Sequence, residues 1–411
     1  MLRFEDVEKD VDSICSDLMK LIDTPGPTQS VARISEHDVR TTKQFPMTVA
    51  VNQIVERINR EHETNIFVFE DHGNLILVGG INHKPSRNEV WNMPTTIGAH
   101  LDEIAYLISG KRDDGSTILL PLCSAPIRTD NNKGHPFTHE ESRILGYRNG
   151  ELLTIGYGRF HAKPRVNVEQ GKHIMTGWNY MLKVDKVLDG EEVRTGDIAI
   201  QDYGTGKASG HFNLTTKITA KALDDRVGST IAIHAIRYLS KLDPPTPVKA
   251  VLSGDEEGFP LDVSWARFIR PTFRKYCRPD GVTIICDGIN GFDLSELVSK
   301  SKGELVESAL LVPYTSHGKG AGDYGLFSLF RDKVIPYARK NGFEVETTTD
   351  YVSRSYDPKI MDEFPLITFL DWSAGEVGDI YARCHMHEEI RVKQIVNLVG
   401  TMVHAVKLLN Y

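Results

Sequence analysis

Apolar residues recur at helical spacing near both ends of the chain. Residues 7–22 carry this pattern and are followed at 23–27 by Asp-Thr-Pro-Gly-Pro, a segment that cannot continue a helix. Residues 49–58 and 392–409 show the same spacing. We therefore predict two early helices and a closing helix, each with one apolar face turned to a core.

Short runs rich in β-branched residues alternate with further helical patterns in the same two end regions. Strands are predicted at 65–70, 74–78, 95–100, 248–253, 282–286, 309–313 and 366–370, and helices at 226–242, 263–276 and 322–341. Strands that alternate with helices of this length indicate α/β layers around a sheet. We expect three layers, with helices flanking a mixed, mostly parallel sheet.

Residues 106–212 follow a different pattern. Short β-like runs at 117–122, 152–157, 180–187 and 197–201 are separated by Gly, Asp, Asn and Pro, without a long helical period. This pattern is typical of a small all-β domain of barrel or sandwich type. We therefore expect an α/β domain built from residues 1–105 and 213–411, with the all-β domain inserted at 106–212.

Charge and cysteine content narrow the class of protein. The 411 residues carry a formal net charge of −8, which argues against nucleic-acid binding, since that requires a basic surface. The five cysteines are far apart and odd in number, as is usual in a reducing compartment. No run reaches the roughly 18 apolar residues of a membrane span, and the N-terminus does not resemble a signal peptide. We expect a cytoplasmic protein with no nucleic-acid or membrane partner.

Candidate metal ligands stand where predicted strands end, which is the edge where open α/β sheets bind ligands. His100 ends the strand predicted at 95–100, and Asp102 lies two residues further on. Residues i and i+2 share one side of an extended strand. One ring nitrogen of His100 can bind a metal ion. Asp102 is placed to accept the N–H of the other ring nitrogen and so to orient the ring toward the metal.

Two acidic segments add further candidates. Asp224 and Asp225 precede a predicted helix, where acids also serve as caps. Their functional interpretation is that Asp224 bridges two metal ions and Asp225 supports it. Glu256 and Glu257 follow the apolar strand at 248–253, a place where unpaired charges are costly. We interpret Glu257 as a metal ligand and Glu256 as the general base that activates water.

One carboxylate and one imidazole complete the set. Asp287 ends the strand at 282–286, and His385 lies just before the closing helix, with His387 as the alternative ligand. A bridging carboxylate in such a set can hold two ions about 3.5–4 Å apart. Mixed nitrogen and oxygen ligands suit zinc, with cobalt or manganese as alternatives. The absence of Cys ligands indicates a hydrolytic rather than a structural site.

At these motifs the sequence resembles the tetrahedral aminopeptidases, also called deblocking or glutamyl-type aminopeptidases, which are dinuclear metallopeptidases. The resemblance is strongest at 99–104 (Ala-His-Leu-Asp-Glu-Ile), 222–228 (Ala-Leu-Asp-Asp-Arg-Val-Gly) and 256–258 (Glu-Glu-Gly). It implies a phosphorylase/hydrolase-like zinc-peptidase core. It also implies that the inserted domain builds subunit contacts in a homo-oligomer assembled from dimers, up to a dodecamer.

The resemblance also assigns roles to the candidates. It implies a cis peptide between Asp224 and Asp225, Glu256 as general base and Asp102 as the partner that orients His100. The family's final His-Ser-Pro-x-Glu motif reads His-Met-His-Glu-Glu at 385–389. The two implied ligand sets are His100, Asp224 and Asp287 for one ion, and Asp224, Glu257 and His385 for the other.

The expected protein is therefore an aminopeptidase that hydrolyses the N-terminal bond of peptides with two divalent metal ions per subunit. Three alternatives remain open from the residues. One is a metal-dependent N-acyl-amino-acid deacylase or carboxypeptidase. Another is a glycosidase, since paired carboxylates also serve sugar hydrolysis. The last is a catalytically silent scaffold.

Overall fold

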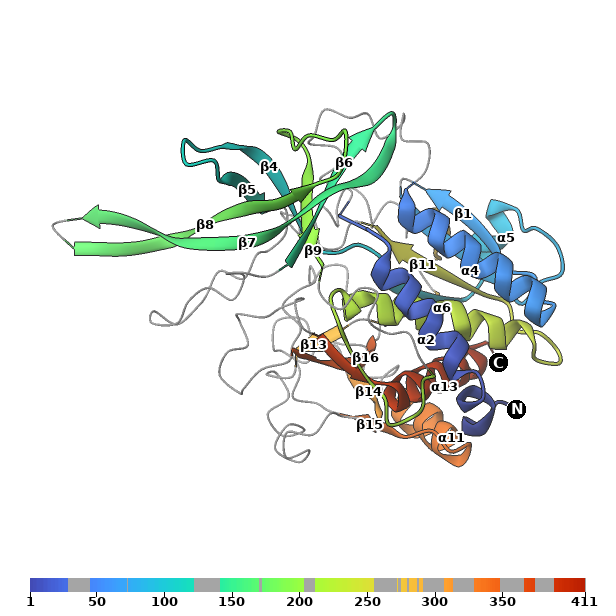
Figure 1. Cartoon of the computed structure of the whole chain (residues 1–411). Coiled ribbons are helices and arrows are strands. Elements are labelled where there is room, and N and C mark those ends of the chain that lie inside the picture. Colours follow the sequence, from blue (N-terminus) through green and yellow to red (C-terminus); the bar gives the residue numbers. More distant parts are fainter. Residues whose placement is uncertain are drawn as a thin grey trace.

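The computed structural model shows an α/β body with a β-barrel beside it (Figure 1). It describes residues 1–28, 45–71, 73–121, 141–169, 172–202, 211–254, 272, 275–278, 281–286, 288–290, 307–312, 329–347, 366–373 and 388–410. Most of the helix predicted at 263–276 lies outside these residues. The strands predicted at 95–100 and 248–253 and the helix predicted at 392–409 have the bounds that the sequence indicates.

Among the described residues, a sheet of 11 strands forms the centre of the α/β body. The pairs β11–β3, β3–β12 and β12–β16 are parallel, whereas β1–β2, β2–β11 and β14–β16 are antiparallel. The pairs β14–β15 and β13–β16 are also parallel, whereas β10–β17 and β16–β17 are antiparallel. The sheet is therefore mixed, as expected, with parallel pairs both at its centre and at the β15 edge. Three short strands lie off the main path: β13 and β17 pair with β16, and β10 pairs with β17. The strands of the main path are, in order, β1 (Phe67–Asp71), β2 (Asn74–Gly79), β11 (Val248–Ser253), β3 (Thr95–His100), β12 (Val282–Ile285), β16 (Leu366–Ser373), β14 (Ala309–Val312) and β15 (Val345–Thr347). The short strands are β10 (Lys217–Ala220), β13 (Gly288–Asn290) and β17 (Glu388–Arg391).

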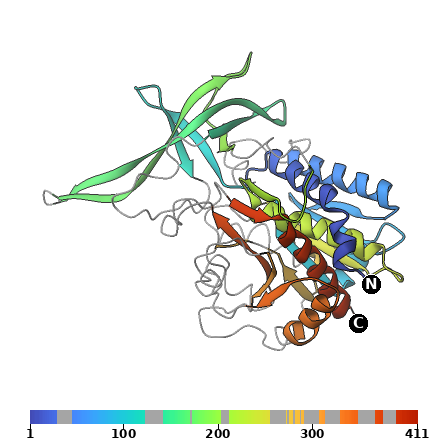
Figure 2. The same cartoon turned by 60° about the horizontal axis from the view of Figure 1, so that its bottom comes forward.

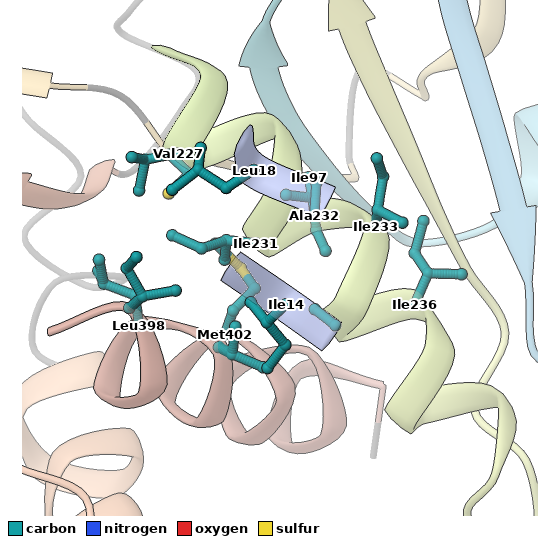
Figure 3. Packing of buried hydrophobic residues seen from close by; sticks show 14 of the residues in the cluster. Ile14, Leu18, Ile97, Val227, Ile231, Ala232, Ile233, Ile236, Leu398 and Met402 are labelled. Carbon is teal, nitrogen blue, oxygen red and sulfur yellow. The ribbon is translucent and has the colours of Figure 1, made fainter. Parts of the chain in front are cut away.

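Helices cover both faces of this sheet. Along β2, Leu75 and Leu77 belong to the core shared with the larger helices, whereas Ile76 and Val78 pack with Val90 on the other face. Figure 3 shows Ile14, Ile231 and Leu398, which come from different helices, meeting in the larger core. Burying each such side chain stabilises the fold by about 1.5–3 kcal/mol. The larger helices are α2 (Val11–Asp23), α4 (Pro46–His62), α6 (Leu223–Ser240) and α13 (Val392–Leu409), and α5 (Arg87–Asn92) covers the opposite face.

Two predicted helices are interrupted in the structure. The pattern at 7–22 is divided between α1 (Phe4–Glu8) and α2, and at the break Asp10 accepts hydrogen bonds from Arg237 and Tyr238 of α6. The pattern at 322–341 includes a π-helical turn, η5 (Phe330–Val334), before α11 (Ile335–Lys340). Pro336, which has no N–H to donate, stands at that junction. No helix among the described residues is long and apolar enough to cross a bilayer.

The strands described between 105 and 201 close into a barrel in the order β4-β5-β8-β7-β6-β9. Tyr106, Phe160 and Leu182 are among the side chains that fill one of its cores. The pairing of β7 with β8 continues past the barrel as a long hairpin that projects away from the body (Figure 2). The sequence indicates only 152–157 of β7 because charged residues and Pro164 interrupt its pattern. The strands are β4 (Ala105–Lys111), β5 (Thr117–Pro121), β6 (Glu141–Arg148), β7 (Glu151–Glu169), β8 (Lys172–Val187) and β9 (Ile198–Gln201).

Candidate metal centre

His100 is buried at the carboxyl end of the central strand β3, with a carboxylate on each side of its ring. Its Nδ1 lies 3.4 Å from Oδ1 of Asp102, and its Nε2 lies 3.4 Å from Oδ1 of Asp224. Two ligand atoms at about 2.1 Å from one tetrahedral ion are separated by about 3.4 Å. The spacing of Nε2 and Oδ1 therefore suits two ligands of a single cation, with Asp102 behind the ring.

Asp225 fixes the segment that presents Asp224. The peptide between the two is cis, which confirms the expectation from the family resemblance. Asp225 accepts hydrogen bonds from the backbone N–H of His100 at 3.0 Å and of Gly228 at 2.8 Å. Burial raises the pKa of its carboxyl well above the usual range, and the adjacent Asp224 adds to this rise. The Asp225 carboxyl thus ties the start of α6 to the end of β3.

Three further segments converge on the His100–Asp224 pair. On β11, Ser253 pairs with His100 and its carbonyl accepts from the N–H of Leu101 at 2.6 Å. On β13, Gly288 packs against Asp224 so closely that an added Cβ would lie 2.8 Å from Cγ. From β17, Oε2 of Glu388 accepts the backbone N–H of Asp224 at 2.9 Å.

The residues that make these contacts are close in sequence to predicted site residues that the structure does not describe. Glu256 and Glu257 lie shortly after Ser253 in the chain, Asp287 directly precedes Gly288, and His385 lies three residues before Glu388. These four predicted residues lie outside the described part of the chain. Within that part, no group of three or more His, Cys, Asp or Glu side chains is arranged as a metal site. The described residues bring together His100, Asp102 and Asp224.

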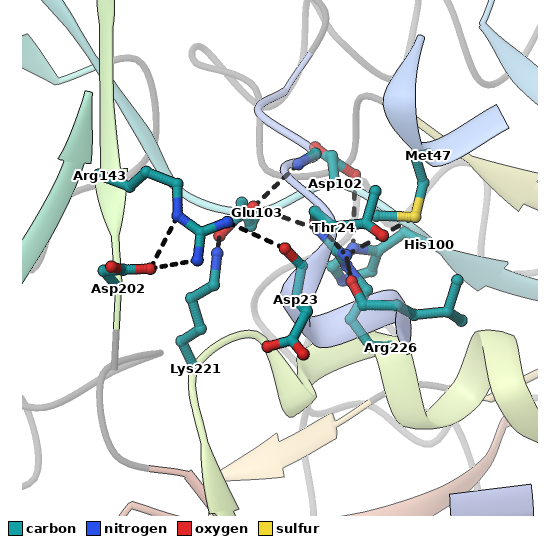
Figure 4. A network of polar contacts seen from close by, with 12 residues as sticks. Asp23, Thr24, Met47, His100, Asp102, Glu103, Arg143, Asp202, Lys221 and Arg226 are labelled. Atoms are coloured by element: carbon teal, nitrogen blue, oxygen red, sulfur yellow. Dashed lines mark hydrogen bonds and ion pairs between the residues drawn. The ribbon is translucent and has the colours of Figure 1, made fainter. Parts of the chain in front are cut away.

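A buried ionic network lies on the barrel side of the pair (Figure 4). Oε2 of Glu103 lies 2.5 Å from Nζ of Lys221, and Oε1 accepts the N–H of Gly26 at 2.9 Å and lies 3.4 Å from Nη2 of Arg226. Burial alone would raise the pKa of Glu103, but Lys221 and Arg226 reverse this and lower it. From the barrel, Arg143 pairs with Asp202 at 2.5 Å and donates to the Asp23 carbonyl at 3.0 Å.

The described centre has more acids than bases. Five carboxyl groups surround it, against two permanent cations, Lys221 and Arg226. With Asp225 left out, because its raised pKa favours the neutral form, four negative and two positive charges leave a surplus of two negative charges. Such a surplus is unfavourable in a buried site unless cations bind there. The donor chemistry thus fits divalent metal ions, with His100 and Asp224 as ligands. The five carboxyl groups belong to Asp102, Glu103, Asp224, Asp225 and Glu388.

Sequence reasoning gave no role to four contributors, of which Glu103 and Arg226 stand inside the recognised motifs. Glu388 and Lys221 stand outside those assignments. Glu388 stands before the closing helix, where an acid suits a helix N-terminus. In the structure it belongs to strand β17 instead. Lys221 stands three residues before Asp224, and this closeness in sequence is all that indicates its place near the centre. Pairing across the sheet is what brings both residues to the centre.

The sequence profile of the M42 glutamyl aminopeptidase family matches residues 79–258. This match confirms the resemblance seen in the motifs and supports a hydrolase that acts on peptides. It spans His100, Asp102, Asp224, Glu256 and Glu257. A search of curated proteins gives no match.

Solved structures of similar fold cover nearly the whole chain. Aminopeptidase APDkam598 from the archaeon Desulfurococcus kamchatkensis is 17% identical, with 98% of this chain and 96% of that chain covered and a TM-score of 0.61. The TET1 peptidase of Pyrococcus horikoshii, which assembles into a tetrahedron or a large octahedral shell, is also 17% identical, with coverage of 95% and 98% and a TM-score of 0.59. An endoglucanase from Thermotoga maritima is 14% identical, with coverage of 95% and 99% and a TM-score of 0.52. At these identities the likeness shows the fold, a mixed α/β architecture.

Proposed function

We propose, from the premise that residues 79–258 match the M42 glutamyl aminopeptidase profile, that this chain is a dinuclear metal-dependent aminopeptidase. It removes residues from the N-termini of peptides. The metal ions are zinc, with cobalt or manganese as alternatives. One ion is held by His100, Asp224 and Asp287, and the other by Asp224, Glu257 and His385.

The observation that carries this proposal is the convergence of five chain segments on the His100–Asp224 pair. Each segment that bears a proposed ligand has a described residue in contact with the pair or with the strand end next to it. These residues are Ser253, Gly288 and Glu388, beside His100 and Asp224 themselves. Segments this far apart in the sequence bring several acids and the imidazole of His100 to one buried point, where cations would offset the negative charge.

The residues of this chain divide the chemistry among them. When bound, the two ions polarise the scissile carbonyl and lower the pKa of a water molecule. Glu256 takes a proton from the attacking water as the water oxygen bonds to the carbonyl carbon, and gives that proton to the leaving amine as the C–N bond breaks. Asp102 accepts the Nδ1–H of His100, which fixes the tautomer with an unprotonated Nε2 and keeps that Nε2 facing Asp224. Recognition of the free α-amino group of the substrate by the acidic centre restricts cleavage to the N-terminus.

A panel of substrates tests this function. The purified protein is assayed on aminoacyl p-nitroanilides, on N-acetylated counterparts and on carboxymethylcellulose, before and after dialysis against a chelator. We expect hydrolysis of the free aminoacyl compounds alone, lost on chelation and restored by zinc, cobalt or manganese. Hydrolysis of only the acylated compounds indicates a deacylase, and activity on the polysaccharide that survives chelation indicates a glycosidase. Inactivity on every substrate with metals bound favours a scaffold.

Glu256→Gln tests the proposed base. This variant keeps the size of the side chain but cannot accept the proton. We expect kcat to fall about 100-fold or more, the usual range for loss of a general base, with metal content unchanged. Full turnover by Glu256→Gln with metals bound contradicts the assignment.

We further propose that residues 106–212 are an oligomerisation domain inserted between 1–105 and 213–411, and that the chain forms a homo-oligomer. Among the described residues, Leu120, Leu153, Tyr157 and Val187 are large hydrophobic side chains of the barrel that remain 37–49% exposed. We propose that these side chains belong to a subunit contact, because contiguous exposed apolar patches mark interaction surfaces. Light scattering should show that Leu153→Lys with Tyr157→Lys yields smaller particles. The control is Leu329→Lys, an equally exposed position outside the barrel.

A further inference from the structure

The geometry points to Glu388 as a positioning residue that holds the proposed bridging ligand Asp224 in place. This inference rests on the proposed two-metal function but assigns a residue beyond it. Glu388 does not face substrate or the ions in this account. It acts through the backbone of Asp224.

Glu388 is fully buried on strand β17, which lies between strands β10 and β16. Strand β17 pairs on one side with β10, where Glu388 lies opposite Ala220, and on the other with β16, where it lies opposite Ser373. Its Oε2 accepts the backbone N–H of Asp224 at 2.9 Å. A carboxylate acceptor makes a stronger bond to an N–H than a neutral acceptor does.

Two carboxylates therefore fasten the segment that carries the ligand. Glu388 binds the N–H on the amino side of Asp224. Asp225, on its carboxyl side, binds the N–H of His100 at 3.0 Å. With both bonds made, the Asp224 side chain stays 3.4 Å from the His100 ring. Loss of either bond frees one end of the segment.

The neighbouring acid Glu389 points away from Asp224 and binds other residues. Its Oε1 accepts from Nζ of Lys217 at 2.6 Å and from Oγ1 of Thr219 at 3.2 Å, on the other face of β17. Successive strand residues point to opposite faces. The register Ala220–Glu388 thus selects the first acid of the pair for the centre. In the family motif the acid four residues after the ligand falls at Glu389, so the motif itself assigns no role to Glu388.

Glu388 also lies in the field of Arg226. Burial lowers the pKa of Arg226, and the charges of Glu103, Asp102 and Glu388 partly oppose this. Arg226 in turn is held by the Leu21 and Thr24 carbonyls. A carboxylate at 388 therefore has a buried cation within electrostatic reach, which reduces the free-energy cost of its burial.

Cobalt(II) titration tests the role of Glu388, because the visible bands of cobalt report both affinity and ligand geometry. The metal-free wild type is compared with Glu388→Gln, Glu388→Met and Glu388→Asp, and with the matched controls Glu389→Gln and Glu389→Met. We expect Glu388→Met to weaken cobalt binding about 10–100-fold, the usual effect of losing a group that orients a ligand. Glu388→Gln keeps an acceptor for the Asp224 N–H and should stay within about 3-fold of wild type. Both controls should bind as the wild type does.

The outcomes separate this inference from the proposed function. A wild type that binds no cobalt overturns the two-metal proposal itself. A wild type that binds cobalt, beside a folded Glu388→Met with equal affinity and equal bands, overturns only the role of Glu388. So does an equal loss in Glu389→Met. If Glu388→Met does not fold, Glu388→Asp serves instead, since it keeps the charge but withdraws the acceptor by one methylene. It should weaken binding, and wild-type affinity there overturns the inference.

Discussion

Nε2 of His100 lies 3.4 Å from Oδ1 of Asp224, although the two residues belong to different chain segments of the α/β body and the barrel strands lie between them in the sequence. This contact exists because β3 ends beside the start of α6, and the Asp225 carboxyl joins the two. The catalytic proposal depends on this juxtaposition. The predictions that follow test it and the fold that maintains it.

Removing the charge behind His100 should weaken the centre. Asp102 faces Nδ1 of the buried ring, and Asp102→Asn leaves its shape while reducing its ability to orient and polarise the imidazole. We expect zinc affinity, measured by competition with a chromogenic chelator, to fall about 10–100-fold. The control is Asp189→Asn, at an exposed position of the barrel. Equal affinity of Asp102→Asn and wild type contradicts the orienting role.

Breaking the buried pair of Lys221 and Glu103 should destabilise the protein strongly. Their side chains are only 1% and 4% exposed, so Lys221→Met leaves a buried carboxylate with weaker compensation. We expect the free energy of unfolding to fall by about 3–5 kcal/mol. The exposed pair of Arg159 and Asp185 is the comparison, and Arg159→Met should lose no more than about 1 kcal/mol. Urea denaturation measures both, and similar losses for the two variants refute the claim.

Gly400 has a packing reason for its place in α13. The ring of Phe343 lies where a Cβ at position 400 would stand. Alanine normally favours a helix over glycine by about 1 kcal/mol, but here Gly400→Ala should be destabilising by about 1–3 kcal/mol because of overpacking. Adding Phe343→Leu should recover part of the loss. Gly110→Ala, where no atom lies within 4 Å of the added Cβ, should change stability by about 0.5 kcal/mol or less. A thermal melt in which Gly400→Ala is the more stable protein disproves this account.

Stability should fall in mild acid because of His234. Burial lowers the pKa of this histidine from 6.5 to about 4, and its Nε2 contacts Oδ2 of Asp17 at 3.0 Å. Between these two pKa values the unfolded chain binds a proton that the folded chain does not. The histidine's contribution is therefore complete above pH 6.5 and is lost as the pH falls toward 4, by about 3 kcal/mol.

The variant His234→Gln isolates this contribution. It keeps a donor for Asp17 but does not titrate. Urea denaturation at a series of pH values should show the stability of the wild type falling faster than that of His234→Gln between pH 6.5 and 4. Parallel curves for the two proteins mean that His234 does not titrate as described.

Local patterns predict much of this fold. The apolar runs at 95–100 and 248–253 and the helical period at 392–409 give elements with matching bounds, because buried strands and amphipathic helices leave a direct trace in hydrophobicity. The cis peptide at Asp224–Asp225 follows from the family resemblance and is present. The outer part of the long β7–β8 hairpin is harder to predict, since charged residues, Pro164 and glycines interrupt its apolar positions.

The site is only partly predictable for a related reason. His100 and Asp102 share one strand end, and their two-residue spacing indicates that they lie together. Glu388 and Glu389 look alike in the sequence, and only the register of β17 against β10 decides which of them reaches Asp224. Register depends on contacts across the sheet rather than on neighbouring residues.

The most direct test of the central claim is the number of divalent ions that each chain binds. Metal-free protein is dialysed to equilibrium against buffered zinc, and bound zinc is measured by mass spectrometry for the wild type and for Asp224→Asn. We expect two ions per wild-type chain and a marked loss of both in Asp224→Asn, because Asp224 is the ligand they share. A wild type without bound zinc, or an Asp224→Asn variant that retains two ions, contradicts it.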